Sequence, residues 1–232
     1  MIVLGFDTAT TATAVALRIA DGSSVELRDD PQPGAHPGHA TRLLALAHEL
    51  LAQAGVAWKQ LDRIAAGAGP GTFTGLRVGL ATAHGLAQSL GAQLVAVSSP
   101  RALAHAAEAQ GIATPLLAVI DARRREVFAG LYGAGAEELL APRPLAPAAV
   151  GELLEEPRPL SALGDGALRY RTALEQAGLE IPPDDSPLHR VSAVAICELG
   201  TRTPPGPSPA AVLPDYRRRP DAELAQSAGG PR

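Results

Sequence analysis

A glycine-rich segment with the sequence GAGPGTFTGLR spans residues 67–77 and has the clearest potential for ligand binding in this chain. It follows a strand-like apolar run and opens a helix-like run. Its glycines and proline allow a tight turn whose free backbone N–H groups can bind phosphate or another anion at a helix N-terminus. A P-loop needs a lysine after its last glycine, and the only lysine of the chain precedes the segment. Gly69, Gly71 and Thr72 are therefore candidate anion contacts in a turn that is not a P-loop.

Two aspartates, Asp7 and Asp121, follow apolar runs that have the composition of buried strands. In a duplicated fold these carboxylates would face one another across a cleft, where such pairs hold a metal–phosphate complex. The alternative is that each carboxylate caps its own turn, because Asp is common in turns. For the chain taken alone we favour the capping role.

Arginines cluster at Arg123–Arg125 and Arg217–Arg219, where they could contact a phosphate, a carboxylate or tRNA. The whole chain has 20 Lys and Arg against 24 Asp and Glu, a net charge of −4. Strong autonomous binding to nucleic acid depends on clustered cations. The acidic balance therefore argues against it.

Signatures of metal binding and nucleophilic catalysis are missing from the sequence. None of the six histidines forms an HExxH-type pair, and His39 is better interpreted as a helix cap or an interface hydrogen bonder. Residues 71–75 have the spacing of a nucleophile elbow, but Phe73 occupies the nucleophile position. We predict neither a catalytic residue nor a metal site.

Apolar periodicity and turn residues predict alternating strands and helices. The predicted strands are 2–6, 14–19, 24–28, 63–66, 93–97, 116–120, 126–132 and 160–163. The predicted helices are 40–54, 75–90, 101–110, 148–154, 167–177 and 192–200.

The two halves of the chain share one plan. Each half contains a strand, an Asp, a polar turn and a second strand, in the segments LGFDTATTATAVAL and LAVIDARRREVFAG. Each half also contains a strand, a Gly-x-Gly turn and a helix start, in the segments IAAGAGPG and LSALGDGA. This repetition predicts an α/β fold of two duplicated subdomains, residues 1–111 and 112–220, whose strand ends face a cleft. We expect residues 221–232 to be a disordered tail.

The helices predicted at 40–54 and 75–90 carry apolar residues on more than one face, whereas packing on a core needs only one apolar stripe. Small residues four positions apart in the second helix also allow another helix to approach closely. We predict a protein–protein interface on these helices. Its candidate residues are His39, Leu43, Ala47, Leu50, Leu51, Gly75, Leu76, Arg77, Gly79, Leu80 and Ala83.

The single cysteine, Cys197, excludes an internal disulfide and lies in an apolar run, so we expect a buried thiol. No apolar run is long enough to span a bilayer, and the N-terminus enters a strand directly. We expect a cytoplasmic protein without membrane contact.

Four segments together resemble the bacterial TsaB (YeaZ) family: residues 4–17, 67–104, 120–128 and 213–220. The resemblance implies the actin-like ATPase (ASKHA, ribonuclease H-like) fold and a role in making threonylcarbamoyladenosine on tRNA. It implies a non-catalytic subunit, homodimeric when alone, that activates the TsaD transferase and is joined by the ATPase TsaE. tRNA would be contacted only through the complex.

TsaD is the related family that must be distinguished. It carries two metal-binding histidines four residues apart, and the matching positions here are Ser99 and Leu103, of which Leu has no donor atom. The implied subunit needs no cofactor, although weak ATP or ADP binding stays open. The alternative function is an independent actin-fold ATPase or small-molecule kinase that uses Asp7, Asp121 and the glycine-rich turn.

Overall fold

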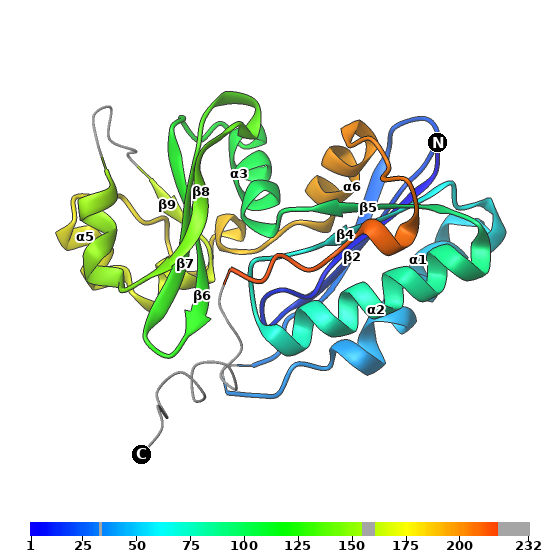
Figure 1. Ribbon diagram of the computed structural model, residues 1–232, viewed down its shortest axis with the longest axis horizontal. Helices are drawn as coiled ribbons and strands as arrows, with labels where there is room; N and C mark the ends of the chain where they lie inside the picture. Colours follow the sequence, from blue (N-terminus) through cyan, green and yellow to red (C-terminus); the bar gives the residue numbers. More distant parts are fainter. Residues whose placement is uncertain (33, 155–160, 218–232) are drawn as a thin grey trace, which may run out of the picture.

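Two β-sheets with flanking helices make up the molecule, which we describe from a computed structural model covering residues 1–32, 34–154 and 161–217. Figure 1 shows the sheets side by side, with the N-terminal half of the chain in one and the following segment in the other. None of the helices in the described ranges has the length and apolarity needed to cross a membrane.

The first sheet has five strands in the order β3-β2-β1-β4-β5. Strands β1, β2 and β3 are antiparallel neighbours, whereas β4 and β5 run parallel to β1. The strands are β1 (Val3–Asp7), β2 (Thr13–Arg18), β3 (Ser24–Asp29), β4 (Arg63–Gly67) and β5 (Gln93–Val97). All five were predicted to within two residues at each end.

The second sheet has the order β8-β7-β6-β9 and repeats the plan of the first. Its strands β6 and β7 pair antiparallel, as β1 and β2 do, and β9 runs parallel to β6, as β4 does to β1. The strands are β6 (Leu116–Arg123), β7 (Glu126–Tyr132), β8 (Glu138–Leu145) and β9 (Ala162–Leu163). The duplicated topology is therefore confirmed.

The longer helices are α1 (His39–Ala54), α2 (Phe73–Leu90), α3 (Ser99–Ala109) and α6 (Ala193–Arg202). Two short helices, α4 (Asp165–Arg169) and α5 (Arg171–Gln176), replace the single helix predicted at 167–177. Residues Pro147–Leu153 form a 3₁₀ helix where an α-helix was predicted. Strand β8 was missed because its two prolines suggested a loop; it is an edge strand, where proline is tolerated.

Alternating side chains divide the first sheet between two cores. Leu4, Phe6 and Ile64 pack with α1 and α2 on one face, whereas Val3 and Ala65 pack with α3 and α6 on the other. Figure 1 shows α1 and α2 together on one side of this sheet and α6 on the opposite side. Helix α3 also contacts β6 of the second sheet, so one core joins both halves.

Helix α6 returns from the second half of the chain to the first sheet, where it packs on β1 and β2. The predicted division at 111/112 thus falls between the two sheets, but the predicted second subdomain contributes a helix to the first sheet's core. The predicted disordered tail, 221–232, lies outside the described residues.

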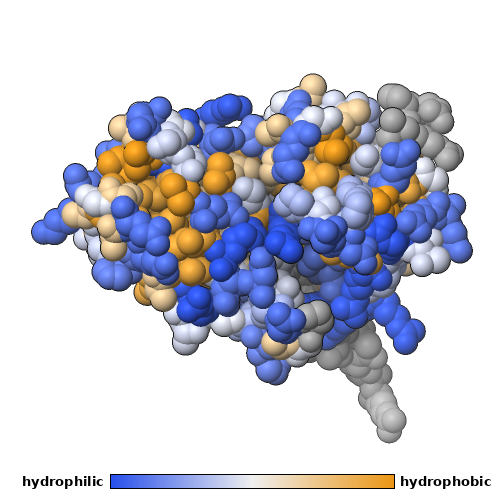
Figure 2. Space-filling model, turned by 180° about the vertical axis from the view of Figure 1, so that it is seen from behind, coloured by the Kyte–Doolittle hydropathy of each residue, from blue (hydrophilic) through white to orange (hydrophobic). Residues whose placement is uncertain are grey.

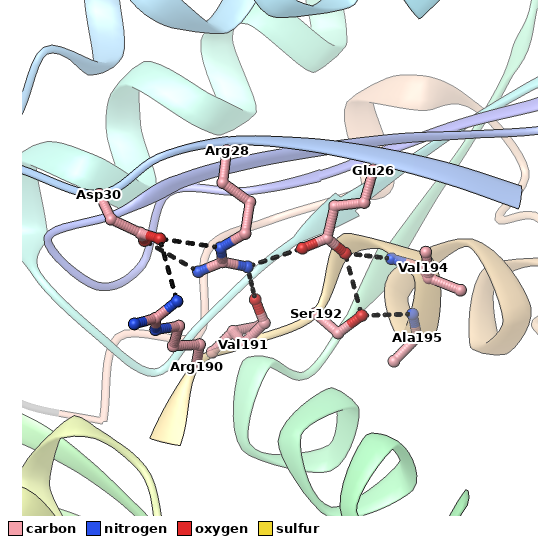
Figure 3. Close-up of polar contacts among 8 residues, drawn as sticks. All are labelled: Glu26, Arg28, Asp30, Arg190, Val191, Ser192, Val194 and Ala195. Atoms are coloured by element: carbon pink, nitrogen blue, oxygen red, sulfur yellow. Dashed lines mark hydrogen bonds and ion pairs between the residues drawn. The ribbon is translucent and has the colours of Figure 1, made fainter. Parts of the chain in front are cut away.

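The start of α6 is fastened to the edge strand β3 by a polar network (Figure 3). The Glu26 carboxylate accepts hydrogen bonds of 3.0 Å from Ser192 Oγ and from the backbone N–H of Val194. Arg28 pairs with Glu26 at 2.8 Å and donates to the carbonyl of Val191 at 2.7 Å. Ser192 also caps the helix by accepting from Ala195 N–H. These contacts fix where the chain re-enters the first sheet.

The other end of α6 is capped by Arg63 from β4. Its guanidinium donates to the carbonyls of Gly200 at 2.6 Å and Thr203 at 2.9 Å, near the helix C-terminus where cations are favourable. Between the two ends, Cys197 is fully buried against β1, and burial raises the pKa of its thiol to about 12. The expected buried thiol is confirmed.

Glycines at every fourth position, Gly67, Gly71, Gly75 and Gly79, bring the start of α2 against the β1–β2 turn. A Cβ on Gly67 would overlap the Asp7 carboxylate, and one on Gly71 or Gly75 would overlap a backbone carbonyl oxygen of the turn. A Cβ on Gly79 would overlap the Thr8 hydroxyl. The glycine-rich segment is thus a packing surface for the chain itself.

We predict that Gly75→Ala destabilises the protein by about 1–3 kcal/mol or more, because the backbone carbonyl of Thr8 cannot move away cheaply. Gly85→Ala is the matched control, since Gly85 lies exposed in the same helix with nothing near its Cβ position. That change should stabilise the protein by about 0.5–1 kcal/mol through helix propensity. Urea unfolding of both variants measures the difference, and equal stabilities would contradict the packing role.

Candidate functional site

The predicted anion loop is occupied by the β1–β2 turn. The N–H of Thr72 donates to the carbonyl of Ala9 at 2.7 Å, and the hydroxyl of Thr8 donates to the carbonyl of Gly75 at 2.7 Å. Gly69 has φ +94°, and its carbonyl accepts from the N–H of Ser99 at 3.0 Å. A cavity lies between the two halves of the molecule, lined by the start of α2, the β6–β7 hairpin and residues 215–217. Of the three candidate contacts in this loop, Gly71 and Thr72 line this cavity and Gly69 does not.

Asp7 is buried and bound within the chain. One carboxylate oxygen accepts from Ser99 Oγ at 2.5 Å and the other from the N–H of Ala9 at 2.9 Å. Burial raises the pKa of Asp7, and the hydrogen bonds from Ser99 and Ala9 oppose that rise. The second of these bonds is the turn cap that we favoured.

Asp121 makes the same turn cap in the second sheet, accepting from the N–H of Arg123 at 2.9 Å. Its carboxylate also pairs with the guanidinium groups of Arg123 and Arg169, each at 3.3 Å. Neither Asp7 nor Asp121 lines the cavity between the two halves. The equivalent positions therefore have equivalent structural roles.

Asp165 lies behind Asp121 and accepts from its backbone N–H at 3.0 Å. Burial raises the pKa of Asp165 to about 6, and the neighbouring Asp121 charge adds to that rise. Among the described residues, no three His, Cys, Asp or Glu side chains are grouped so that they could hold a metal ion.

The predicted interface residues are, except for Arg77, buried inside the chain. Leu43, Leu50 and Leu80 are at most 4% exposed and belong to the core between α1, α2 and the first sheet. Gly75 and Gly79 face Thr8 of the β1–β2 turn. The interpretation of these positions as excess apolar surface is wrong, because α1 is buried by both β2 and α2 and needs more than one apolar face.

The exposed residues of α1 and α2 are mixed: Arg42, Glu49 and Arg77 are charged, and several others are small or apolar. Leu44 is 47% exposed, and Ala45, Ala52 and Ala81 are also exposed. Figure 2, which shows the molecule from behind, has a larger group of apolar side chains over the half that contains the first sheet and a smaller group over the other half. An interface on these two helices stays a prediction. The residues that could form it are the exposed ones, not the buried ones named from the sequence.

His39 is the first residue of α1, one position inside the Gly38 N-cap, and is 4% exposed. Its Nδ1 is hydrogen-bonded to the Thr13 hydroxyl at 2.8 Å, and burial lowers its pKa. The prediction of a capping side chain is wrong, because no side-chain hydrogen bond caps this helix.

The C-terminal segment at 215–217 reaches the start of α2, where the N–H of Asp215 donates to the carbonyl of Ala68 at 2.8 Å. Tyr216 packs against Phe73 with ring centroids 5.5 Å apart and the rings tilted by 34°, and Arg77 donates to the Tyr216 hydroxyl at 3.2 Å. Local sequence patterns could not predict this contact, because it joins residues far apart in the chain. The only sequence signal was the resemblance of residues 213–220 to a family motif.

Comparison with known proteins agrees with this architecture. A family model described as "TsaD: tRNA N6-adenosine threonylcarbamoyltransferase" matches residues 32–180. The solved structure of YeaZ from Pseudomonas aeruginosa is 31% identical with a TM-score of 0.73, covering 92% of this chain and 100% of that one. The chain is thus an α/β protein of the actin-like (ASKHA) fold.

Sequence relatives give the particular family. The tRNA threonylcarbamoyladenosine biosynthesis protein TsaB of Haemophilus influenzae is 37% identical over 128 residues, which cover 55% of this chain and 52% of that protein. The matched part therefore spans about half the length of this curated relative. An uncharacterized protein of Mycobacterium tuberculosis is 33% identical over 95% of this chain and 93% of its own length. The chain belongs to the TsaB (YeaZ) family.

We predict that Asp165→Asn flattens the dependence of stability on pH between about 4 and 6. The pKa of Asp165 in the folded protein lies above the ordinary value of an aspartate, 3.8, so folding binds a proton in this window and stability falls as pH rises through it. The variant should therefore gain on the order of 2–3 kcal/mol over the wild type between pH 4 and pH 7. Thermal unfolding at a series of pH values measures this, and parallel curves would contradict it.

Proposed function

We propose that this chain is a non-catalytic subunit of the tRNA threonylcarbamoyladenosine synthesis complex. It binds and activates a TsaD-like transferase, which modifies the adenosine next to the anticodon, and it forms a homodimer when alone. A TsaE-like ATPase joins the complex. This chain interacts with tRNA only through the assembled complex. The names of the TsaB relatives support the biosynthetic role.

The observation that carries the non-catalytic role is the environment of Ser99 and Leu103, the positions that match the two metal-binding histidines of TsaD. Ser99 is fully buried, and its hydroxyl is used to bind Asp7. Leu103 is 1% exposed in the core that α3 shares with both sheets. A leucine has no donor atom for a metal ion, so these positions serve packing in this chain.

The partner surface that we propose is the exposed face of α1 and α2. Only Arg42 and Glu49 are charged in α1, and only Arg77 is charged in α2. The centres of protein–protein interfaces are depleted in charged residues. Exposed Leu44 provides an apolar contact on this face. The buried leucines of the two helices pack in the core beneath this surface and would not contact the partner.

We predict that Leu44→Arg weakens both self-association and binding to a TsaD-like subunit by at least about tenfold, because a buried guanidinium there would have no matched partner. Leu139→Arg is the matched control, since Leu139 is 51% exposed on β8 in the other half of the molecule. Light scattering and co-purification measure the two equilibria. Undiminished assembly of Leu44→Arg would contradict the proposed surface, provided that both variants unfold at the wild-type temperature.

The alternative is an independent actin-fold ATPase or small-molecule kinase. It is less well supported because both aspartates that it would use are engaged by their own turns, and the start of α2 is packed against Thr8 and Ala9. ATP turnover by the purified chain that is lost in Asp7→Asn would favour this alternative over the scaffold role.

A further inference from the structure

The first sheet ends on one side at β3, and the outer edge of this strand has free backbone groups. The N–H of Ile19 donates to the carbonyl of Ser23 at 3.0 Å, which sets the alternation of hydrogen bonds along the β2–β3 hairpin. The backbone groups of Ser24, Glu26 and Arg28 therefore point away from β2. Within the described part of the chain, these groups have no backbone partner. We propose that this edge binds an extended peptide segment of another protein, which adds a strand to the sheet.

The other three sheet edges are protected against such pairing. The 3₁₀ helix Pro209–Ala211 contacts β5, β8 contains Pro142 and Pro144, and β9 has only two residues. Covering elements, prolines and short length are devices by which proteins block pairing at an exposed edge. Strand β3 has six residues, and none of them is proline. Of the four edges in the described ranges, β3 is therefore the one suited to accept a further strand.

The charged side chains of β3 leave the edge open. Glu26 and Arg28 extend across one face of the sheet toward the start of α6 (Figure 3), and they pair with each other at 2.8 Å. The Glu26 carboxylate also accepts from Ser192 Oγ and from the N–H of Val194. Because both charges are satisfied within the chain, a bound strand needs no charged side chain on this face.

The opposite face of the edge is apolar and borders a small pocket. Val25 pairs with Leu17 of the core beneath α1, so it lies on the α1 side of the sheet, where it is 54% exposed. The pocket, about 270 Å³ in volume, lies between the β2–β3 hairpin and the end of α1, and Ile19, Val25, Leu50 and Ala54 form part of its wall. A side chain beside Val25 would enter this pocket. The bound segment is therefore one with aliphatic residues at alternate positions.

A synthetic peptide with the sequence of residues 13–19, TAVALRI, is a suitable probe, because this sequence already pairs antiparallel with the inner side of β3. The control peptide TVLIAAR has the same composition, but its aliphatic residues are consecutive. In calorimetric titration of the full chain, we expect the first peptide to bind at least about tenfold more tightly than the control. Equal affinities, or no saturable binding of the first peptide, would overturn the proposal.

Amide hydrogen exchange measured by NMR locates the bound peptide. The N–H groups of Ser24, Glu26 and Arg28 should exchange quickly in the free protein and slowly in the complex, whereas those of Val25 and Leu27, which face β2, should be protected in both. Unchanged exchange at the three outward groups would place the binding elsewhere and overturn the assignment. Protection without peptide that increases with protein concentration would show a second copy at this edge and overturn the proposed occupant.

Two substitutions test the backbone edge and the pocket separately. Ser24→Pro removes an outward N–H at the first position of the strand, where proline is tolerated, and Ala54→Met fills the pocket. Each should weaken binding of the first peptide by at least about tenfold. Ala109→Met, at the exposed end of α3 and outside the pocket, is the matched control and should leave the affinity unchanged. Wild-type affinity in either test variant would overturn the proposal. These measurements use no transferase, so their outcome is independent of the proposed function.

Discussion

The close packing of the β1–β2 turn against the start of α2 is the constraint on which the first half of this molecule depends. Four glycines at intervals of four residues, Gly67 in β4, Gly71 before α2, and Gly75 and Gly79 within α2, leave room for Asp7, Thr8 and Ala9. A Cβ added at any of them would meet atoms of that turn. The hydrogen bonds from Thr72 N–H to the Ala9 carbonyl and from the Thr8 hydroxyl to the Gly75 carbonyl then join the turn to the start of α2. A segment whose composition suggests phosphate binding thus becomes part of the protein's own interior. The same packing sets the position of α2, and through it the wall of the cavity.

The relation between the two halves depends on α6. This helix packs on the first sheet although it follows the second in the chain, and it is fastened at one end by Glu26 and Arg28 and at the other by Arg63. The core that it shares with α3 reaches the second sheet. The two halves are therefore held together by the polar contacts at both ends of α6 and by the apolar core that α6 shares with α3.

Short apolar runs bounded by turn residues predicted nearly every strand, and the repeated strand–Asp–turn–strand pattern predicted the duplicated topology. Strand β8 was not predicted because its prolines, which lack a backbone N–H donor, suggested a loop. At the edge of a sheet the loss of that donor matters little. The interface residues were misplaced for a different reason. Composition shows that a helix is apolar on several faces, but not that β2 and α2 both cover α1. The cavity could not be predicted, since Arg123, His39 and Arg217 meet only in the folded chain.

The central claim is that this chain assists a transferase and does not perform the transfer itself. Reconstituted modification of tRNA with threonylcarbamoyl-adenylate tests it most directly, comparing this chain alone, a TsaD-like subunit with its TsaE-like ATPase, and all three together. We predict no modified adenosine from this chain alone and strong stimulation when it joins the other two. Modified tRNA from the isolated chain, or a transferase reaction that proceeds equally well without it, would contradict the account.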